Sequence, residues 1–271
     1  MTLNVSDTST WLPLDGLAPG FDANKASPVT DLNGQSYQID SAQGIQNFEF
    51  TTEGLRWQAG EQGGLDEHEV FAVAPELYYV QWQQHDALQF SGSLLLDLET
   101  GRALFVAARL VYPDQTVAGQ TAVDHKFVPG VISGRQPSGA EIAPSRALIG
   151  RRVQWVYSET HAYEHIYLSE QWYTWQCLAG PERGLADTDQ NTVYEIRPGI
   201  YLFSWREKVI PCGSITVADH RDVNNIRSHG ALFGWDESGT VAVHFSFGAY
   251  GKLISVTSHP EPYEPAQWDA S

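Results

Sequence analysis

The chain has 271 residues, a length typical of one large domain or of two domains of about 130 residues each. It carries 33 Asp and Glu against 16 Lys and Arg, a formal net charge of −17 with neutral His, which argues against nucleic acid and an anionic membrane surface as partners. Aromatic residues make up 12% of the chain and Gly numbers 24, a composition that favours strands over helices. Two cysteines cannot staple a chain of this length, so we expect a fold that does not depend on disulfides.

The N-terminal segment shows no targeting signal, because it has neither a basic start nor an apolar core segment. No apolar run of the chain approaches the roughly 18–20 residues that cross a bilayer as a helix. We therefore expect a cytoplasmic protein without a membrane partner.

The chain divides into two copies of one plan. In chain order, we expect an N-terminal extension over 1–24, a first copy over 25–118, a linker over 119–145 with one strand in its VPGVIS portion, and a second copy over 146–271. The linker is expected because prolines and glycines gather there with little periodicity.

An internal repeat supports this division. The phrase LYYVQWQQ, which ends at Gln84, recurs as IYLFSWRE, which ends at Glu207. Other short segments match in the same order: 32–34 with 148–150, 47–50 with 162–165, 55–58 with 173–176, and 103–105 with 231–233. Five matches in one order indicate a duplication.

Both copies show the pattern of short antiparallel strands, which alternate apolar and polar residues between turn signals. In the second copy, strands are expected over 153–158, 162–169, 172–178, 192–197, 200–207, 214–220, 231–236, 240–248 and 252–258. Segments 13–25 and 217–227 are compatible with short helices. Seven to nine strands in each copy predict an all-β protein of two tandem antiparallel barrels, and a barrel of about eight strands can hold one ligand.

One strand of the second copy places an acid at the end of an aromatic face. Because side chains alternate along a strand, Tyr201, Phe203, Trp205 and Glu207 share one face. The same face of the first copy ends in Gln84. Any chemistry is therefore expected in the second copy, although a packed core for the aromatic residues and a surface charge for Glu207 are the alternatives.

Further faces of the second copy carry polar and aromatic residues together. They hold His161, Tyr163, His165 and Tyr167; Val153, Trp155 and Tyr157; and Tyr173, Trp175 and Cys177. On a strand, His161 and His165 lie about 13 Å apart, too far to chelate one metal ion easily. No zinc or nucleotide motif is present in the sequence, so we expect neither a metal nor a cofactor.

The second copy resembles the C-terminal domain of the MoaF family. The resemblance lies in IGRRVQWVYSETHAYEHIYLSEQWYTW, followed by GLADTD, YLFSWREKVIP and GALFGWD. The first copy is similar to the N-terminal domain of that family, which is named from molybdenum cofactor and monoamine operon contexts. The resemblance covers nearly the whole chain and implies two lipocalin-like, calycin-type barrels.

A more distant similarity links the second copy to phenolic acid decarboxylases, which are small single barrels. Their Ile-Gly, Tyr-x-Tyr, Tyr-Glu-Ile-Tyr and Ser-Trp-x-Glu motifs match residues 149–150, 155–157, 163–164 and 204–207, with Trp155 in place of the first tyrosine. The arginine of that family matches Arg183 with a one-residue insertion. The resemblance implies that Tyr157 and Arg183 orient the substrate and that Glu207 protonates the forming carbon.

The favoured function is a cofactor-independent lyase or isomerase that acts on a small, partly apolar, aromatic or unsaturated acid or carbonyl. Glu207 is the expected general acid/base, with a pKa raised by its aromatic surroundings. The other expected catalytic residues are Arg183, which would hold an anionic group, and Tyr157, His161 and His165, which would donate or relay protons. The expected ligand-binding residues are Trp155, Tyr163, Trp175, Phe203 and Trp205.

Two other functions stay open. One is a non-catalytic carrier of an apolar small molecule, and the other is an accessory protein linked to molybdenum cofactor operons. The difference between Glu207 and Gln84 favours the enzyme, because a carrier has little use for an ionisable acid in one copy alone. In the first barrel we expect Phe48, Phe50 and Trp57, together with Trp82, to fill the interior and leave no pocket larger than that of the second. The sequence leaves open whether the chain forms a homodimer.

Overall fold

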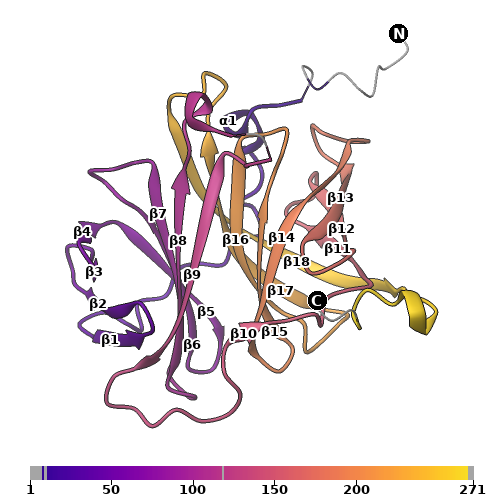
Figure 1. Cartoon of the computed structure of the whole chain (residues 1–271). Helices are drawn as coiled ribbons and strands as arrows, with labels where there is room; N and C mark the ends of the chain where they lie inside the picture. Colours follow the sequence, from indigo (N-terminus) through magenta and orange to yellow (C-terminus); the bar gives the residue numbers. More distant parts are fainter. Residues whose placement is uncertain (1–7, 9–10, 118, 268–271) are drawn as a thin grey trace.

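A computed structural model describes residues 8, 11–117 and 119–267 and shows two antiparallel sheets of nine strands each, which lie side by side (Figure 1). The strands of the first sheet are β1 (Ser36–Ser41), β2 (Gly44–Phe50), β3 (Leu55–Ala59), β4 (Gln62–Asp66), β5 (His68–Ala74), β6 (Leu77–Gln83), β7 (Phe90–Asp97), β8 (Arg102–Leu110) and β9 (Val123–Ile132). Those of the second are β10 (Ala143–Pro144), β11 (Arg151–Val156), β12 (Ala162–Tyr167), β13 (Trp172–Ala179), β14 (Ala186–Arg197), β15 (Ile200–Arg206), β16 (Cys212–Asp219), β17 (Ile226–Trp235) and β18 (Ala242–Val256).

The strand orders confirm the expected tandem antiparallel barrels. The first sheet runs β4-β3-β2-β1-β9-β8-β7-β6-β5 and is nearly closed. The second runs β10-β14-β13-β12-β11-β18-β17-β16-β15, and an additional pairing of β14 with β15 closes it into a barrel. The helical elements are short: α1 (Leu14–Leu17), η2 (Pro113–Gln115) and η3 (Glu261–Tyr263). Segment 217–227 forms the end of β16, a turn and the start of β17. No helix in the described part of the chain is long and apolar enough to cross a membrane.

The two barrels share a buried tryptophan–aspartate pair, which supports the duplication. In the first barrel, Trp57 Nε1 donates a hydrogen bond to Asp66 Oδ2 at 2.6 Å, and Asp66 Oδ1 accepts one from the backbone amide of His85 at 2.7 Å. In the second barrel, Trp175 Nε1 donates to Asp189 Oδ2 at 2.9 Å. Because both barrels contain this contact, Trp57 corresponds to Trp175 and Asp66 corresponds to Asp189.

The second hydrogen bond to each aspartate places Glu207 and Gln84 at corresponding positions of the two barrels. Asp189 Oδ1 accepts from the backbone amide of Lys208 at 3.0 Å, so Lys208 corresponds to His85. The residues that precede them are Glu207 and Gln84. The structure therefore places the carboxyl group and its amide counterpart at the same point of the two barrels.

One of the sequence matches is wrong by two residues. Phe48 pairs with Trp57 across β2 and β3, and His165 pairs with Trp175 across β12 and β13. His165 is therefore the counterpart of Phe48, whereas the sequence comparison matched it with Phe50. The reason is that a shift of two residues keeps the same side chains on the inner face of a strand, so alternation cannot detect it.

Strand β9 lies within the segment 119–145 that we expected to be a linker. It pairs with β8 along its whole length and with β1 near its end, so the first barrel extends to Ile132. The expected strand in the VPGVIS portion is its second half. Residues Pro129 and Gly130 interrupt the apolar alternation there, which hides the strand in the sequence.

The outer faces of the two barrels pack against each other. One hydrophobic cluster joins Phe71, Leu95 and Val106 of the first barrel to Leu202 and Val217 of the second. Because the strands at this interface bury both faces, the burial of β7 and β15 does not alternate. Buried side chains therefore pack inside each barrel and also between the two barrels.

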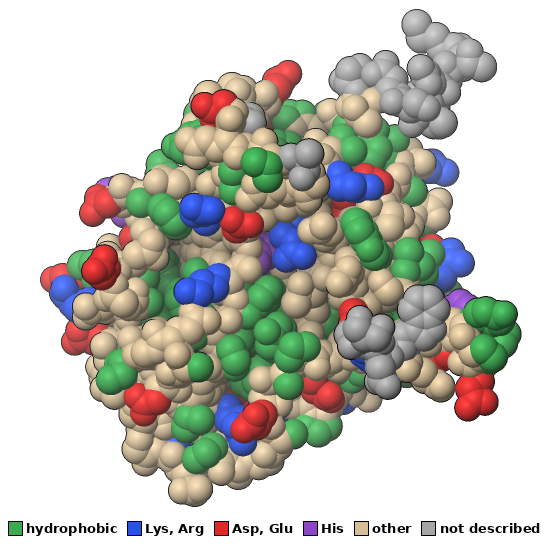
Figure 2. Space-filling model, viewed as in Figure 1, with side chains coloured by type: hydrophobic (Ala, Val, Ile, Leu, Met, Phe, Trp, Pro, Cys, Tyr) green, Lys and Arg blue, Asp and Glu red, His purple; other side chains and the backbone are tan. Residues whose placement is uncertain are grey.

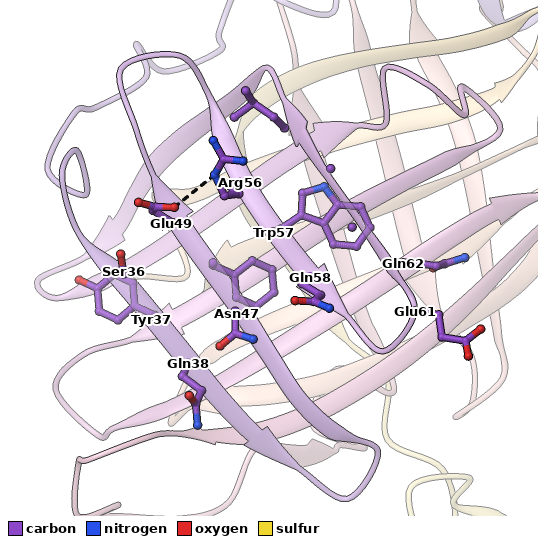
Figure 3. A pocket seen from close by; sticks show the side chains of 14 residues that line it. Ser36, Tyr37, Gln38, Asn47, Glu49, Arg56, Trp57, Gln58, Glu61 and Gln62 are labelled. Atoms are coloured by element: carbon purple, nitrogen blue, oxygen red, sulfur yellow. Dashed lines mark ion pairs between the residues drawn. The ribbon is translucent and has the colours of Figure 1, made fainter.

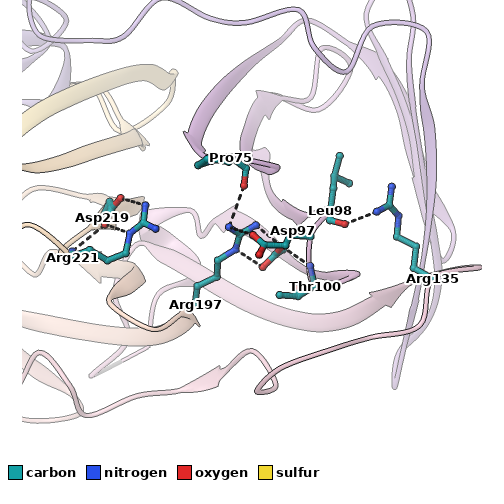
Figure 4. A network of polar contacts seen from close by, with 9 residues as sticks. Pro75, Asp97, Leu98, Thr100, Arg135, Arg197, Asp219 and Arg221 are labelled. Carbon is teal, nitrogen blue, oxygen red and sulfur yellow. Dashed lines mark hydrogen bonds and ion pairs between the residues drawn. The ribbon is translucent and has the colours of Figure 1, made fainter.

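A buried ion pair crosses this interface (Figure 4). Arg197 donates to both carboxylate oxygens of Asp97, at 2.8 and 2.6 Å, and to the backbone oxygen of Pro75 at 3.1 Å. The Asp97 side chain is fully buried, which by itself raises its pKa. Hydrogen bonds from Arg197 and Thr100 outweigh burial and hold the pKa of Asp97 below its usual value.

On the face seen in Figure 2, acidic and basic side chains are interspersed among hydrophobic ones. No large field of one sign covers this face, although the chain carries a net charge of −17.

Candidate functional site

The interior of the second barrel contains a small cavity of about 40 Å³ lined mostly by buried side chains, here called the Glu207 cavity. Its walls are Leu17, Phe21, Tyr157, Tyr163, His165, Tyr173, Trp175, Glu182, Trp205, Glu207, Cys212 and Leu232. The expected residues Tyr157, Tyr163, His165, Trp175, Trp205 and Glu207 thus meet around one space. Most of the other walls are apolar or aromatic, so a carboxyl group here is removed from water.

Glu207 follows directly after β15, where the strand leaves the barrel wall. Its backbone amide donates to the oxygen of Cys212 at 2.9 Å, which holds the turn at this end of the barrel. Its Oε1 accepts a hydrogen bond from Trp205 Nε1 at 3.2 Å. Burial raises the pKa of Glu207 well above its ordinary value, and the nearby Asp189 and Glu182 add to the effect.

A second carboxyl group in the cavity, that of Glu182, is one that sequence reasoning missed. Glu182 lies in the turn between β13 and β14 and is buried. Its Oε2 accepts a hydrogen bond from the Tyr163 hydroxyl at 2.9 Å, while its Oε1 has no hydrogen-bond partner among the described residues. Burial raises the pKa of Glu182, and the hydrogen bond from Tyr163 opposes part of that rise.

Asp189 supports the cavity from behind its wall. The side chain is fully buried on β14 and accepts the two hydrogen bonds from Trp175 and Lys208 described above. Burial raises the pKa of Asp189 to about 6 despite these bonds. Glu207, Glu182 and Asp189 therefore form a group of carboxyls whose pKa values are all raised, chiefly by burial.

The structure does not bring Arg183 to this site. Its side chain is exposed, and its neighbour Glu182 takes the inward position in the same turn. His161 also lies outside the cavity walls: its Nδ1 is 3.0 Å from Ser158 Oγ and 3.0 Å from Thr160 Oγ1. The anion-binding role that resemblance implied for Arg183 has no geometric support.

A smaller second cavity of about 10 Å³, here called the inner cavity, lies deeper in the barrel. It is lined by Leu148, Trp155, Tyr157, His165, Tyr167, Tyr201, Phe203, Trp205, Thr216, Ala218, His220 and Ser228. Tyr157, His165 and Trp205 are walls of both cavities. Trp155 and Phe203 belong to the inner cavity alone, so the expected ligand-binding residues are divided between two cavities.

The N-terminal extension closes the Glu207 cavity, although it precedes the first barrel in the chain. Leu14, Leu17 and Phe21 are buried in the core of the second barrel. The ring of Phe21 lies 4.7 Å from that of Tyr157 and 5.7 Å from that of Tyr163, measured between centroids. Figure 1 shows α1 at the upper end of the barrels. The extension therefore acts as the cover of the site rather than as a surface tail.

A glycine allows this cover to approach closely. Gly20 has a φ of +94°, a conformation that glycine adopts without cost. A Cβ atom at this position would lie 2.6 Å from the His161 ring. Asn24 then fixes the end of the segment, because its backbone amide donates to the oxygen of Tyr157 at 3.0 Å.

The corresponding interior of the first barrel is filled with hydrocarbon. Phe48, Phe50, Trp57 and Trp82 are buried in one cluster, as the sequence predicted. Gln84 is partly exposed.

An open hollow of about 820 Å³ nevertheless lies on β1–β4 of the first barrel (Figure 3). Gln38, Asn47 and Gln58 lie in one row across β1, β2 and β3, beside an ion pair between Arg56 and Glu49 at 3.3 Å. The expectation that the first barrel would hold no pocket larger than that of the second is wrong, which counts against a purely structural role for it. The signal for this hollow in the sequence is the row of amide side chains at exposed, alternate positions of β1, β2 and β3.

Comparisons with known proteins identify relatives for both barrels. The model of the MoaF N-terminal domain matches residues 9–112, and that of the MoaF C-terminal domain matches residues 142–257. Protein MoaF of Klebsiella aerogenes is 34% identical over 200 residues, which cover 70% of this chain and 74% of that protein. Among solved structures, a putative beta-lactamase from Burkholderia vietnamiensis is similar over 40% of this chain and 95% of its own, with 10% identity and a TM-score of 0.32, too low to carry an argument.

Proposed function

The chain belongs to the MoaF family, and we propose that it is a cofactor-independent enzyme of the lyase or isomerase type, which moves protons on a small, largely apolar molecule in the Glu207 cavity. The observation that carries this proposal is a pair of carboxyl groups, Glu207 and Glu182, that face one small aromatic cavity. Two carboxyls in different environments can serve as acid and base in one reaction.

The surroundings assign different roles to the two acids. Burial raises the pKa of Glu207 more strongly than that of Glu182, which favours Glu207 as the proton donor and Glu182 as the acceptor. Glu182 keeps one oxygen free of hydrogen bonds from the described residues, and this oxygen can accept a proton from a substrate carbon. Tyr163 donates to its other oxygen and orients the carboxyl group.

The size of the cavity limits the substrate that fits without movement. About 40 Å³ admits only a few atoms, on the scale of one to three water molecules. A larger substrate requires Leu17 and Phe21 to shift, because these two residues are the only walls that come from outside the barrel strands and their turns. We therefore assign the N-terminal extension the role of an entrance.

A carrier function is the second candidate, and the aromatic cavity beneath the N-terminal extension favours it as well. The two functions differ in turnover. A carrier binds and releases its ligand unchanged, whereas an enzyme with an acid and a base exchanges carbon-bound hydrogen of the ligand with solvent.

The test is hydrogen exchange in deuterium oxide, followed by nuclear magnetic resonance, with a panel of small ketones and unsaturated acids. The wild-type protein should accelerate the exchange of at least one compound above the buffer rate. Glu207→Gln and Glu182→Gln should each lose about 100-fold or more of this rate. Glu237→Gln, in an exposed turn, is the matched control and should keep it. Tight binding of a compound without any exchange would favour the carrier.

A further inference from the structure

Polar atoms without partners gather around the inner cavity. Trp155 Nε1, His165 Nδ1, Tyr167 OH and His220 Nδ1 are all buried and have no hydrogen-bond partner among the described residues. Each of these side chains lines the inner cavity and is less than one tenth exposed. Buried polar groups in proteins are nearly always satisfied. Four of them around one small space indicate a bound atom that the chain itself does not supply.

The hydrogen-bonding capacity of these groups specifies the kind of atom. The indole nitrogen of Trp155 can only donate a hydrogen bond. Tyr167 keeps its hydroxyl proton at neutral pH, because burial raises its pKa. The Trp155 N–H approaches this hydroxyl and offsets part of that rise, but the two groups do not form an aligned hydrogen bond, so the indole N–H stays available to an acceptor. Both donors belong to side chains that line the inner cavity, and they therefore call for a hydrogen-bond acceptor there. An oxygen atom fits a volume of about 10 Å³.

The charge of the surroundings favours a neutral acceptor. Burial lowers the pKa of both His165 and His220 to about 3, so neither ring is charged at neutral pH. None of the residues that line the inner cavity is Lys or Arg. The guanidinium of Arg151 lies 5.9 Å from the ring centroid of Tyr201, which is itself a wall of the cavity. A carboxylate in this cavity would lack a counter-ion in contact, and burying it would be costly.

We propose that the inner cavity binds the oxygen of a neutral carbonyl compound, with Trp155 and Tyr167 as donors, while the carbon skeleton of the ligand lies in the Glu207 cavity. The volumes agree with this, since about 10 Å³ is room for one oxygen atom. The shared walls Tyr157, His165 and Trp205 show that the two cavities are neighbours. This inference rests on the proposed function for the place of the carbon skeleton and names its substrate class.

The reaction that follows is a proton transfer next to the carbonyl group. The ionised carboxylate of Glu182 takes a proton from the carbon beside the carbonyl, and the C–H electron pair becomes the carbon–carbon double bond of an enolate. The negative charge moves to the oxygen, where the hydrogen bonds from Trp155 and Tyr167 strengthen. Glu207 returns a proton to carbon, and the proton on Glu182 then passes back to Glu207. No electrons enter or leave, so no redox partner is required.

Two probes of equal shape test the oxygen site. Butan-2-one and 2-methylbut-1-ene differ in that C=O replaces C=CH₂, so both fill the same space and only the ketone offers an acceptor. We expect the wild-type protein to bind the ketone at least about tenfold more tightly, a typical effect of one or two hydrogen bonds to a buried site. The Nε1–H resonance of Trp155, assigned with Trp155→Phe, should shift downfield with the ketone alone.

Variants identify the donor. Tyr167→Phe removes only the hydroxyl and should abolish most of the preference for the ketone. Tyr37→Phe removes a hydroxyl in the first barrel that bonds to Gln35, and it should leave the preference unchanged. Equal affinity of the wild type for both probes, or a Trp155 resonance that does not respond, would overturn the proposal and mean that the polar atoms hold water only. This comparison needs no variant, so a Tyr167→Phe protein that fails to fold does not affect it.

The inference and the proposed function can fail separately. Hydrogen exchange of butan-2-one that depends on Glu207, with equal binding of ketone and alkene, would reject the oxygen site and keep the enzyme. A clear preference for the ketone without exchange of its hydrogens would keep the oxygen site and reject the enzyme.

Discussion

The proton on Asp189 should make a contribution to the free energy of unfolding that falls as the pH rises from about 4 to about 6. The buried His165 and His220 contribute in the opposite sense over the same range, because burial lowers their pKa from 6.5 to about 3. The pKa of Asp189 is raised in the folded protein from 3.8 to about 6, chiefly by burial. The folded state therefore binds the proton more tightly than the unfolded chain. The stability from this proton is complete below the unfolded pKa and is lost as the pH passes through the folded pKa.

The magnitude follows from the size of the shift. A rise of about two pKa units corresponds to about 3 kcal/mol, at 1.4 kcal/mol per unit. This is a large fraction of the roughly 5–15 kcal/mol that stabilises a typical domain. The pKa of Glu207 is raised as well, so the loss should continue above pH 6. Asp97 acts in the opposite sense only below its ordinary pKa, because its pKa is lowered in the folded state.

Urea unfolding at a series of pH values between 4 and 7, followed by tryptophan fluorescence, measures this loss. Asp189→Asn removes the falling contribution, so the stability of the variant should change with pH between 4 and 6 by about 3 kcal/mol more in the upward direction than that of the wild type. Its absolute stability should be lower, because the amide nitrogen faces a donor from Trp175 or Lys208. A slope between pH 4 and pH 6 that is the same in Asp189→Asn and in the wild type would refute the reasoning.

Three further substitutions test other parts of the structure. Phe21→Ala should lower the free energy of unfolding by about 3–5 kcal/mol, the usual loss for a buried ring. It should also let the Glu207 cavity bind small apolar probes in calorimetry. Unchanged stability would mean that the cover is not packed as described. Arg197→Met leaves Asp97 buried without its partner and should lower the free energy of unfolding in urea by about 3–5 kcal/mol. Adding Asp97→Leu in a double variant should restore most of this loss. Glu76→Gly should raise the free energy of unfolding by about 0.5–1 kcal/mol, seen as a higher melting temperature. The reason is that Glu76 has a φ of +56° at the position where the second barrel has Gly199. A lower melting temperature would show that the Glu76 side chain stabilises the fold by more than the backbone strain destabilises it.

The barrels could be predicted from the sequence because their signal is local and repeated. Alternation along β15 placed Trp205 and Glu207 on the inner face, and the repeat placed Gln84 at the matching point. Both inferences depend on neighbours along one strand, and a strand keeps its two-residue period whatever it packs against.

The parts that could not be predicted depend on contacts between distant segments. Glu182 is a single acid in a turn, and its inward direction is fixed by the hydroxyl of Tyr163, which is 19 residues away. Phe21 covers a barrel that begins more than a hundred residues later in the chain. The interface cluster around Leu95 and Leu202 removes alternation where the two barrels meet. No periodic pattern in the sequence reports such contacts.

The central claim is that Glu207 transfers protons in the cavity of the second barrel. The measurement that tests it most directly is the rate of hydrogen exchange of butan-2-one in deuterium oxide, compared between the wild type and a folded Glu207→Gln protein. The amide has nearly the same shape and keeps an oxygen for the Trp205 hydrogen bond, so ketone binding should persist. The rate should fall by about 100-fold or more. An unchanged exchange rate in the variant, at unchanged affinity, would contradict the account.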